Sequence, residues 1–159
     1  MQDMSASVPA PRRLTAPPDA QTIPLSPPRD RQPRVLKHGE VFALFDARGD
    51  IDPREEEGAG LYRRDTRRLS RYQLTLAGRA PLLLSSTIAL GSGVLKADCA
   101  NPDLRAEDGA TLSRDTIHVA RAKFLHESGC SERIVVRNYG ADRTVCAPAL
   151  ITTSERHFD

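Results

Sequence analysis

Residues 71–84 have the sequence RYQLTLAGRAPLLL, in which apolar and polar side chains alternate and are then followed by three leucines. Alternation with a period of two is typical of a β-strand that has one buried and one solvent-exposed face. We therefore predict a strand over residues 71–76 and a turn over 77–80. The leucines at 82–84 are apolar on both faces, so they predict a return strand that is buried more deeply than its partner.

The same period continues on both sides of this segment. Val41, Ala43 and Phe45 are predicted to share one face of a strand. That strand ends in a turn over residues 46–50, where Gly49 supplies a positive φ. Further strands are predicted over residues 88–96, 116–125 and 134–136, the last in a hairpin with a strand that starts at Val145.

These short strands occur without long amphipathic helices and without any alternation of strands and helices, which predicts an all-β fold. Antiparallel strands with one solvent-exposed and one buried face favour a β-sandwich of two sheets over a single layer. Two connections, residues 52–68 and 98–115, exceed the usual length of a hairpin loop. We predict that both are long loops with binding or docking roles.

The chain has 159 residues, which suits one domain with one core. Eight of its 12 prolines fall within residues 1–33, a segment with few large apolar side chains. Such a segment cannot bury enough surface to offset the entropy lost on ordering. We therefore predict a disordered, proline-rich arm over residues 1–33 and a single domain over residues 34–159.

The charged residues are nearly balanced, with 23 Lys and Arg against 21 Asp and Glu. A net charge of +2 gives no general case for a nucleic-acid partner or for an anionic membrane. The longest uncharged stretch, residues 80–95, is interrupted by polar residues and glycines and does not suit a membrane span. The N-terminus lacks a cationic start followed by an apolar run, so we expect a cytoplasmic protein.

The sequence nominates no catalytic or metal-binding residue. Cys99, Cys130 and Cys146 have no CxxC spacing and are expected to be buried thiols. No GxSxG nucleophile motif occurs. The acidic residues of the predicted loops are expected to be solvated, and they offer no unique pair for glycosidic bond hydrolysis. These acidic residues are Asp46, Asp50, Asp52, Asp65, Asp98, Asp103, Glu107 and Asp108.

Charge is concentrated in the first of the two predicted long loops. Five arginines lie between Arg63 and Arg71, both included. Guanidinium groups bind phosphate or carboxylate through paired hydrogen bonds, so this segment is a candidate anion clamp. The alternative is that the arginines are solvated and pair with neighbouring acidic side chains.

Residues 60–86, GLYRRDTRRLSRYQLTLAGRAPLLLSS, resemble the N-terminal domain of bacterial and archaeal type glycogen debranching enzymes. The family pattern is GLxxRDTRxLSRYxLxLNGxxPLLLSS, and Ala77 stands where asparagine is usual. The resemblance covers residues 34–150. Three further segments agree in order: residues 45–51 are similar to the DxxGDI turn, 101–104 to the TNPDL element and 132–140 to ERLxLRNYG.

In this family the domain is a β-sandwich that precedes an (α/α)6 toroid, and the toroid carries the carboxylates that hydrolyse α-1,6-glucosidic branch points. The resemblance implies the same sandwich here, without the toroid. The family's sheet also continues after the strand at Val145 through a stretch such as DFADxFEVRG, where this chain has SERHFD over residues 154–159. We therefore expect a sandwich that is incomplete at its C-terminus.

The resemblance implies a non-catalytic domain that docks on, or supports, a helical-toroid α-1,6-glucosidase domain. It implies no cofactor. Two alternatives stay open: an independent module that binds α-glucan, and a protein that associates with itself through an unpaired edge strand. The residues predicted to form the docking surface or the rim of the substrate groove are Tyr62, Arg64, Asp65, Thr66 and Arg67.

Overall fold

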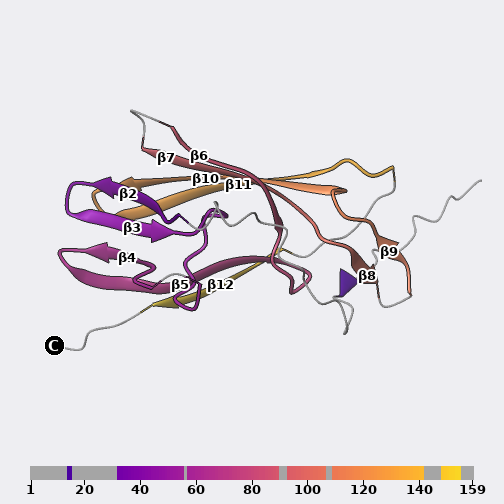
Figure 1. Cartoon of the computed structure of the whole chain (residues 1–159), viewed down its shortest axis with the longest axis horizontal. Helices are drawn as coiled ribbons and strands as arrows, with labels where there is room; N and C mark the ends of the chain where they lie inside the picture. The colour runs from indigo at the N-terminus through magenta and orange to yellow at the C-terminus, as the bar shows by residue number, and fades with distance from the viewer. Residues whose placement is uncertain are drawn as a thin grey trace, which may run out of the picture.

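The computed structural model of the chain describes residues 14–15, 32–55, 57–89, 93–106, 109–141 and 148–154. Over these residues the regular structure consists of β-strands alone, arranged in three antiparallel sheets. Figure 1 shows the two larger sheets as layers, one above the other. The prediction of an all-β, antiparallel, sandwich-like fold is confirmed.

The five-stranded sheet has the strand order β12-β5-β4-β3-β2. Four of these strands follow one another along the chain and lie side by side, and the last strand of the chain is added next to β5. The strands are β2 (Arg34–His38), β3 (Val41–Phe45), β4 (Gly60–Arg63), β5 (Thr66–Leu76) and β12 (Pro148–Ser154).

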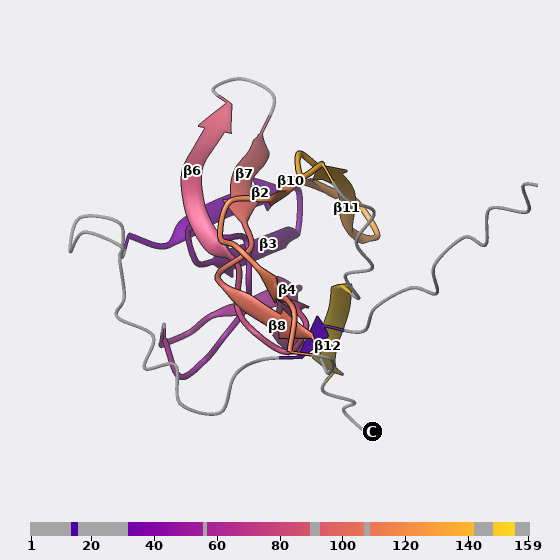
Figure 2. The ribbon, with the colours of Figure 1, turned by 90° about the vertical axis from the view of Figure 1, so that its right-hand side faces the viewer.

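The four-stranded sheet has the order β11-β10-β7-β6. It contains β6 (Leu82–Ala89), β7 (Val94–Ala100), β10 (Ile117–His126) and β11 (Gly129–Asn138). A small third sheet lies at one end of the sandwich, facing the viewer in Figure 2. It is formed by β1 (Leu14–Thr15), β8 (Leu104–Ala106) and β9 (Thr111–Leu112).

The core between the larger sheets is divided into two apolar clusters. One is built around Leu74 and Val119, and the other around Phe45 and Leu95. β10 contributes to both clusters, because its buried face continues from Val119 to Leu125. The two positions between these residues on the same face are charged, so a layer of charge separates the two clusters along the strand.

Several local predictions are confirmed. The strand over residues 41–45 buries Val41, Ala43 and Phe45 on one face. The turn over residues 46–50 is closed by hydrogen bonds between its backbone groups, and Gly49 has a φ of 81°. The predicted strand over residues 116–125 corresponds to β10 (Ile117–His126).

The predicted pairing of residues 71–76 with 82–84 is wrong. β5 and β6 belong to different sheets, so the turn after Leu76 carries the chain from one layer to the other. The leucines of β6 are not the more deeply buried ones, since Leu84 is 56% exposed and Leu74 only 1%. β6 is the edge strand of its sheet and has β7 as its one neighbour there. Its side chains therefore stay accessible to solvent.

The predicted hairpin between residues 134–136 and a strand from Val145 is also wrong. β11 pairs with β10, and β12 pairs with β5 in the other sheet. The register places Leu150 of β12 opposite the buried Leu74, on the inner face of the sandwich. Residues 142–147, which connect the two strands, lie outside the described residues.

Residues 88–96 form parts of two strands and not one, because β6 ends at Ala89 and β7 begins at Val94. The two predicted long loops also contain strands: β4 lies within residues 52–68, and β8 and β9 lie within residues 98–115. These strands have only four, three and two residues, which is too few for a period of two to be recognised.

The predicted disordered arm, residues 1–33, falls mostly outside the described residues. Inside it, Leu14 lies opposite Ala106 and Thr15 lies opposite Arg105, so β1 adds an antiparallel strand to β8. No helix long and apolar enough to cross a membrane occurs in the described part of the chain.

The cysteines were expected to be buried thiols. Cys99 is completely buried, and burial raises the pKa of its thiol to about 12. Cys130 is half-buried, and burial raises the pKa of its thiol as well. Cys146 lies outside the described residues.

Candidate functional site

The five predicted docking residues lie in one tight hairpin between β4 and β5. Arg63 pairs with Thr66, so Arg64 and Asp65 alone form the turn. Both have positive φ values, 49° and 59°, as the favoured two-residue turns of β-hairpins require. The structure therefore brings Tyr62, Arg64, Asp65, Thr66 and Arg67 together, but on a two-stranded hairpin and not in a long loop.

The turn of this hairpin is tied to the neighbouring turn between β2 and β3. Arg64 Nε contacts Glu40 Oε2 at 2.7 Å, and the Arg64 amide donates a hydrogen bond to the Glu40 carbonyl at 3.2 Å. The guanidinium of Arg64 lowers the pKa of the Glu40 carboxyl. Both side chains are largely exposed, so this ion pair positions the turn more than it stabilises the fold.

Tyr62 lies flat on the outer face of the five-stranded sheet. Its ring stacks on Phe42, with 4.6 Å between the ring centroids and 3° between the planes, and its hydroxyl donates to the Gly58 carbonyl at 2.8 Å. Gly60 makes this arrangement possible. A Cβ atom at Gly60 would lie 2.9 Å from the Tyr62 ring and 2.8 Å from Cδ of Arg67. The side chains of Tyr62 and Arg67 therefore lie directly over Gly60, where any larger residue would collide with them.

Apolar side chains continue across this outer face beyond Tyr62. Val35 lies opposite Leu44, and Phe42 lies opposite Tyr62, on the side of the sheet that faces away from the core. Val35 is 52% exposed and the other three are half-buried. We call these four residues the outer apolar patch. Contiguous exposed apolar surface of this kind often marks a site of interaction.

The remaining residues of the hairpin offer polar groups next to this patch. Arg67 lies opposite Tyr62. The Thr66 hydroxyl donates to the Arg64 carbonyl at 3.5 Å. Asp65 is exposed, and its carboxylate has no hydrogen bond or ion pair with any described residue. The hairpin and the patch together form one outward-facing surface that combines apolar and charged groups.

A second charged cluster, which the sequence did not reveal, lies in the core. Arg121 of β10 contacts Asp50 from the 46–50 turn at 2.6 Å and Glu132 of β11 at 2.7 Å. Lys123 contacts the other oxygen of Glu132 at 2.8 Å. Tyr72 of β5 donates its hydroxyl to this same oxygen. We call Asp50, Tyr72, Arg121, Lys123 and Glu132 the buried ionic network; it joins the two larger sheets.

Burial and charge act on the titrating groups of this network in opposite directions. Burial, followed by the nearby charge of Arg121, lowers the pKa of Lys123 to about 8. Burial would raise the pKa of Glu132, but the charges of Arg121 and Lys123 outweigh it and the net shift is downward. The Lys123 ammonium also lies 4.1 Å from the centre of the Tyr72 ring, a cation–π contact.

The network satisfies its own charges and is closed to solvent. The side chains of Arg121, Lys123 and Asp50 are 1–3% exposed. Arg121 also donates to the Arg48 carbonyl at 2.8 Å, and the Leu74 amide donates to Asp50 at 3.2 Å. The ion pairs of Arg121 and Lys123 lie almost entirely out of solvent, and they tie the two sheets to each other.

The prediction that the loop carboxylates are solvated is wrong at the 46–50 turn and just after it. Asp50 is 2% and Asp52 4% exposed. Asp52 accepts hydrogen bonds from Arg54 and from Gln73 of β5, and the bond from Arg54 lowers its pKa. The 46–50 turn packs against the four-stranded sheet, where Asp50 contacts Arg121, so the carboxylate of Asp50 is buried.

Asn101 organises the segment that precedes β8. It is completely buried. Its amide nitrogen donates to the carbonyls of Pro102 and Ser113 at 2.8 and 2.9 Å, and its oxygen accepts from the Ile117 amide at 2.6 Å. One side chain thus ties residues 102, 113 and 117 together, which is a structural role.

No group of three or more His, Cys, Asp or Glu residues able to hold a metal ion occurs in the part of the chain that the structure describes.

Comparison with known proteins identifies the scaffold. The model of one protein family, described as the N-terminal domain of (some) glycogen debranching enzymes, matches residues 36–151. No curated protein and no solved structure matches the chain. The matched range extends from β2 to β12 and includes both the hairpin and the buried ionic network. The chain thus belongs to the family of N-terminal domains found in some glycogen debranching enzymes.

Proposed function

We propose that this domain is non-catalytic and docks on a helical-toroid α-1,6-glucosidase domain through the β4–β5 hairpin and the outer apolar patch. In the absence of a nominated pair of carboxylates, hydrolysis is assigned to the helical domain. The role of this domain is to support that partner and to contribute to the rim of its substrate groove.

The observation that carries this proposal is the direction in which the motif side chains point. Asp50, Asn101 and Glu132 belong to family motifs and are bonded inside the domain. Arg64 and Asp65 also belong to a family motif, but they project into solvent from the tip of the hairpin. Arg64 contacts only the neighbouring turn through Glu40, and the Asp65 carboxylate contacts no described residue, so a partner outside the domain accounts for the place of Asp65 in the motif.

The composition of the surface supports the same proposal. Interfaces between proteins combine a centre of aromatic and aliphatic side chains with a polar rim, in which arginine is enriched. Here Phe42 and Tyr62 provide the aromatic centre, and Arg64 and Arg67 lie at its border. The hairpin is held by strand pairing and by the contacts of Arg64 with Glu40, so docking would lose little conformational entropy.

The test is to titrate the full chain into a separately produced helical-toroid domain of a glycogen debranching enzyme and to measure heat of binding. Asp65→Asn keeps the shape and the positive φ that asparagine tolerates, and it removes one charge. We expect it to weaken the complex about tenfold, as the loss of a charged hydrogen bond does.

Asp115→Asn is the matched control, because Asp115 is likewise exposed and has a φ of 64° in a turn. It lies outside the proposed surface and should bind like the wild type. Equal effects of the two substitutions, or no complex with the wild-type chain, would overturn the proposal.

The first alternative is an independent module that binds α-glucan, and the stacked pair of Phe42 and Tyr62 favours it. Affinity electrophoresis of the full chain in a glycogen-containing gel separates the two hypotheses. A docking domain alone should migrate as in a gel without glycogen. Retardation that Tyr62→Ala abolishes would favour the module.

The second alternative is self-association. β11 and β12 are edge strands of their sheets, and the inner-face residues Val136 and Leu150 are 46% and 49% exposed. Edge strands with accessible apolar residues can pair with a second copy. Sedimentation velocity would reveal a dimer, and Leu150→Lys should dissociate it.

A further inference from the structure

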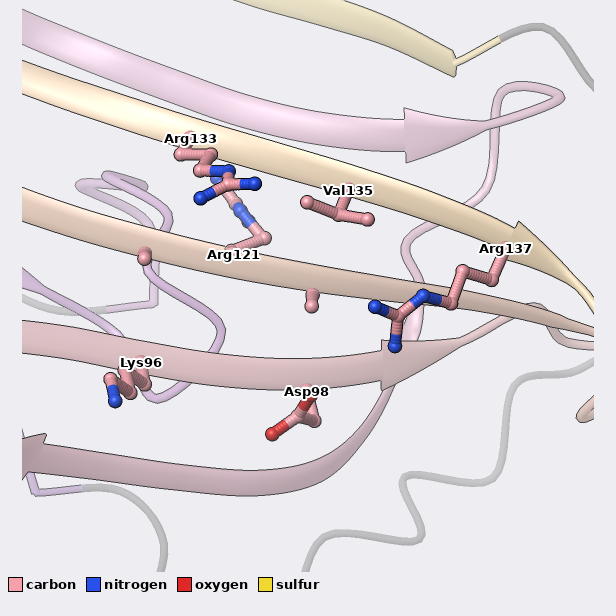
Figure 3. A pocket seen from close by; sticks show the side chains of 8 residues that line it. Lys96, Asp98, Arg121, Arg133, Val135 and Arg137 are labelled. Atoms are coloured by element: carbon pink, nitrogen blue, oxygen red, sulfur yellow. The ribbon is translucent and has the colours of Figure 1, made fainter.

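The outer face of the four-stranded sheet has a cavity of about 310 Å³ that the proposed docking surface does not include. It lies over β7, β10 and β11, on the layer opposite the β4–β5 hairpin. Figure 3 shows its side chains projecting from neighbouring strands. We call it the cationic trough; the lining residues used below are Lys96, Asp98, Ala120, Ala122, Arg133 and Arg137.

The trough exists because two alanines occupy adjacent outward positions of the central strand. Ala120 lies opposite Asp98, and Ala122 lies between Lys96 of β7 and Arg133 of β11. Longer side chains therefore rise on both sides of a floor of methyl groups. The volume is at the lower end of the range found for small-ligand sites.

Three of the lining side chains are cations that pair with no residue in the described part of the chain. Lys96, Arg133 and Arg137 have no hydrogen bond or ion pair with any residue in the described ranges. By contrast, Arg121, on the buried face of the same strand pair, forms ion pairs with two carboxylates. Guanidinium groups that line the same opening suit an oxyanion with several oxygens, such as phosphate.

One carboxylate on the β7 side is held in place. Asp98 accepts a hydrogen bond from the Ser85 hydroxyl at 3.1 Å, and its other oxygen contacts Nε2 of His118 at 3.0 Å. Its side chain is still 44% exposed. A positioned carboxylate of this kind accepts hydrogen bonds from hydroxyl groups and repels a bare anion.

We propose that the cationic trough binds a phosphorylated sugar, with the phosphate held by Arg133 and Arg137 and a sugar hydroxyl donating to Asp98. The combination of free guanidinium groups with a fixed carboxylate fits a ligand that carries both an anion and hydroxyl groups. A hexose phosphate has a size that suits the cavity. This site is independent of docking, since it lies on the other sheet.

Calorimetric titration of the full chain with glucose 6-phosphate, inorganic phosphate and glucose tests this proposal. We expect saturable binding of glucose 6-phosphate and weaker binding of the other two. Arg137→Gln should weaken the binding of glucose 6-phosphate about tenfold. Arg68→Gln is the matched control, because Arg68 is an exposed arginine of β5 outside the trough, and it should bind like the wild type.

Asp98→Ala distinguishes the sugar from the phosphate. It removes the acceptor for the hydroxyl and a negative charge near the phosphate. Inorganic phosphate should then bind at least as well as to the wild type, while the preference for glucose 6-phosphate over phosphate should disappear. Thermal unfolding of each variant separates lost binding from lost folding.

Three results would overturn the proposal. They are the absence of saturable binding, equal weakening by Arg68→Gln and Arg137→Gln, and equal affinity for phosphate and glucose 6-phosphate in the wild type. Binding of a glutamate-rich peptide in place of the sugar phosphate would assign the trough to an acidic polypeptide instead.

Discussion

The hairpin tip and the buried ionic network are both dense in charge, yet their charges have opposite surroundings. At the hairpin tip, Arg64 and Glu40 form an ion pair in which both side chains are more than 60% exposed. In the network, Arg121 and Glu132 form one in which neither is more than 7% exposed. A charged motif in the sequence can therefore serve either the surface or the core. Which of the two it serves depends on whether its side chains point into solvent or into the core.

The largest expected effect is on the network. Arg121→Met keeps most of the apolar length of the side chain but leaves Asp50 and Glu132 buried without their main partner. We expect the free energy of unfolding to fall by about 3–5 kcal/mol, as measured by urea denaturation.

Arg68→Met is the control for this substitution, because Arg68 is exposed. It should change the free energy of unfolding by less than about 0.5 kcal/mol. A similarly small loss for Arg121→Met would show that the network contributes little to the fold.

The next effect concerns pH and Lys123. The pKa of Lys123 is about 8 in the folded protein, against an ordinary value of 10.5 for a lysine. Between these values the unfolded chain binds more protons than the folded one, so stability rises with pH. Over pH 8 to 10 we expect Lys123 to add about 2 kcal/mol to the free energy of unfolding.

Lys123→Met should remove this rise, since methionine carries no proton to lose. Urea denaturation of the wild type and the variant across pH 8 to 10 gives the difference directly. Parallel curves would mean that Lys123 keeps its proton in the folded state as readily as in the unfolded chain.

The smallest effect on stability belongs to the hairpin tip. Arg64→Ala removes an exposed ion pair with Glu40. We expect the free energy of unfolding to change by less than about 1 kcal/mol, by the same denaturation measurement. A loss comparable to that of Arg121→Met would mean that Arg64 serves the fold and not a partner.

The sequence predicted the fold class because most long strands have a clear period of two. It did not predict which strands pair. One example is the pairing of β5 with β12. Both strands have an apolar face, and so does every other long strand, so periodicity cannot choose among partners. The pairing itself, which periodicity does not specify, brings Leu150 of β12 opposite Leu74 of β5 within one sheet.

The sequence also located the hairpin residues but not the network. In β10 the buried face includes Arg121 and Lys123 between Val119 and Leu125, which breaks the expected alternation of apolar and polar residues. Their partner Glu132 comes from β11, and Asp50 from a distant turn. Only the placement of Arg121 and Lys123 on the face of Val119 and Leu125 could have indicated a buried charge.

Amide hydrogen exchange of the full chain, alone and with the helical-toroid domain of a glycogen debranching enzyme, tests the docking claim most directly. We predict slower exchange on complex formation over residues 60–67 and over β2 and β3, which form the outer surface. β10, which lies within the other sheet, should exchange at the same rate with and without the partner. Unchanged exchange at the hairpin in a complex that forms, or protection of β10 alone, would contradict the account.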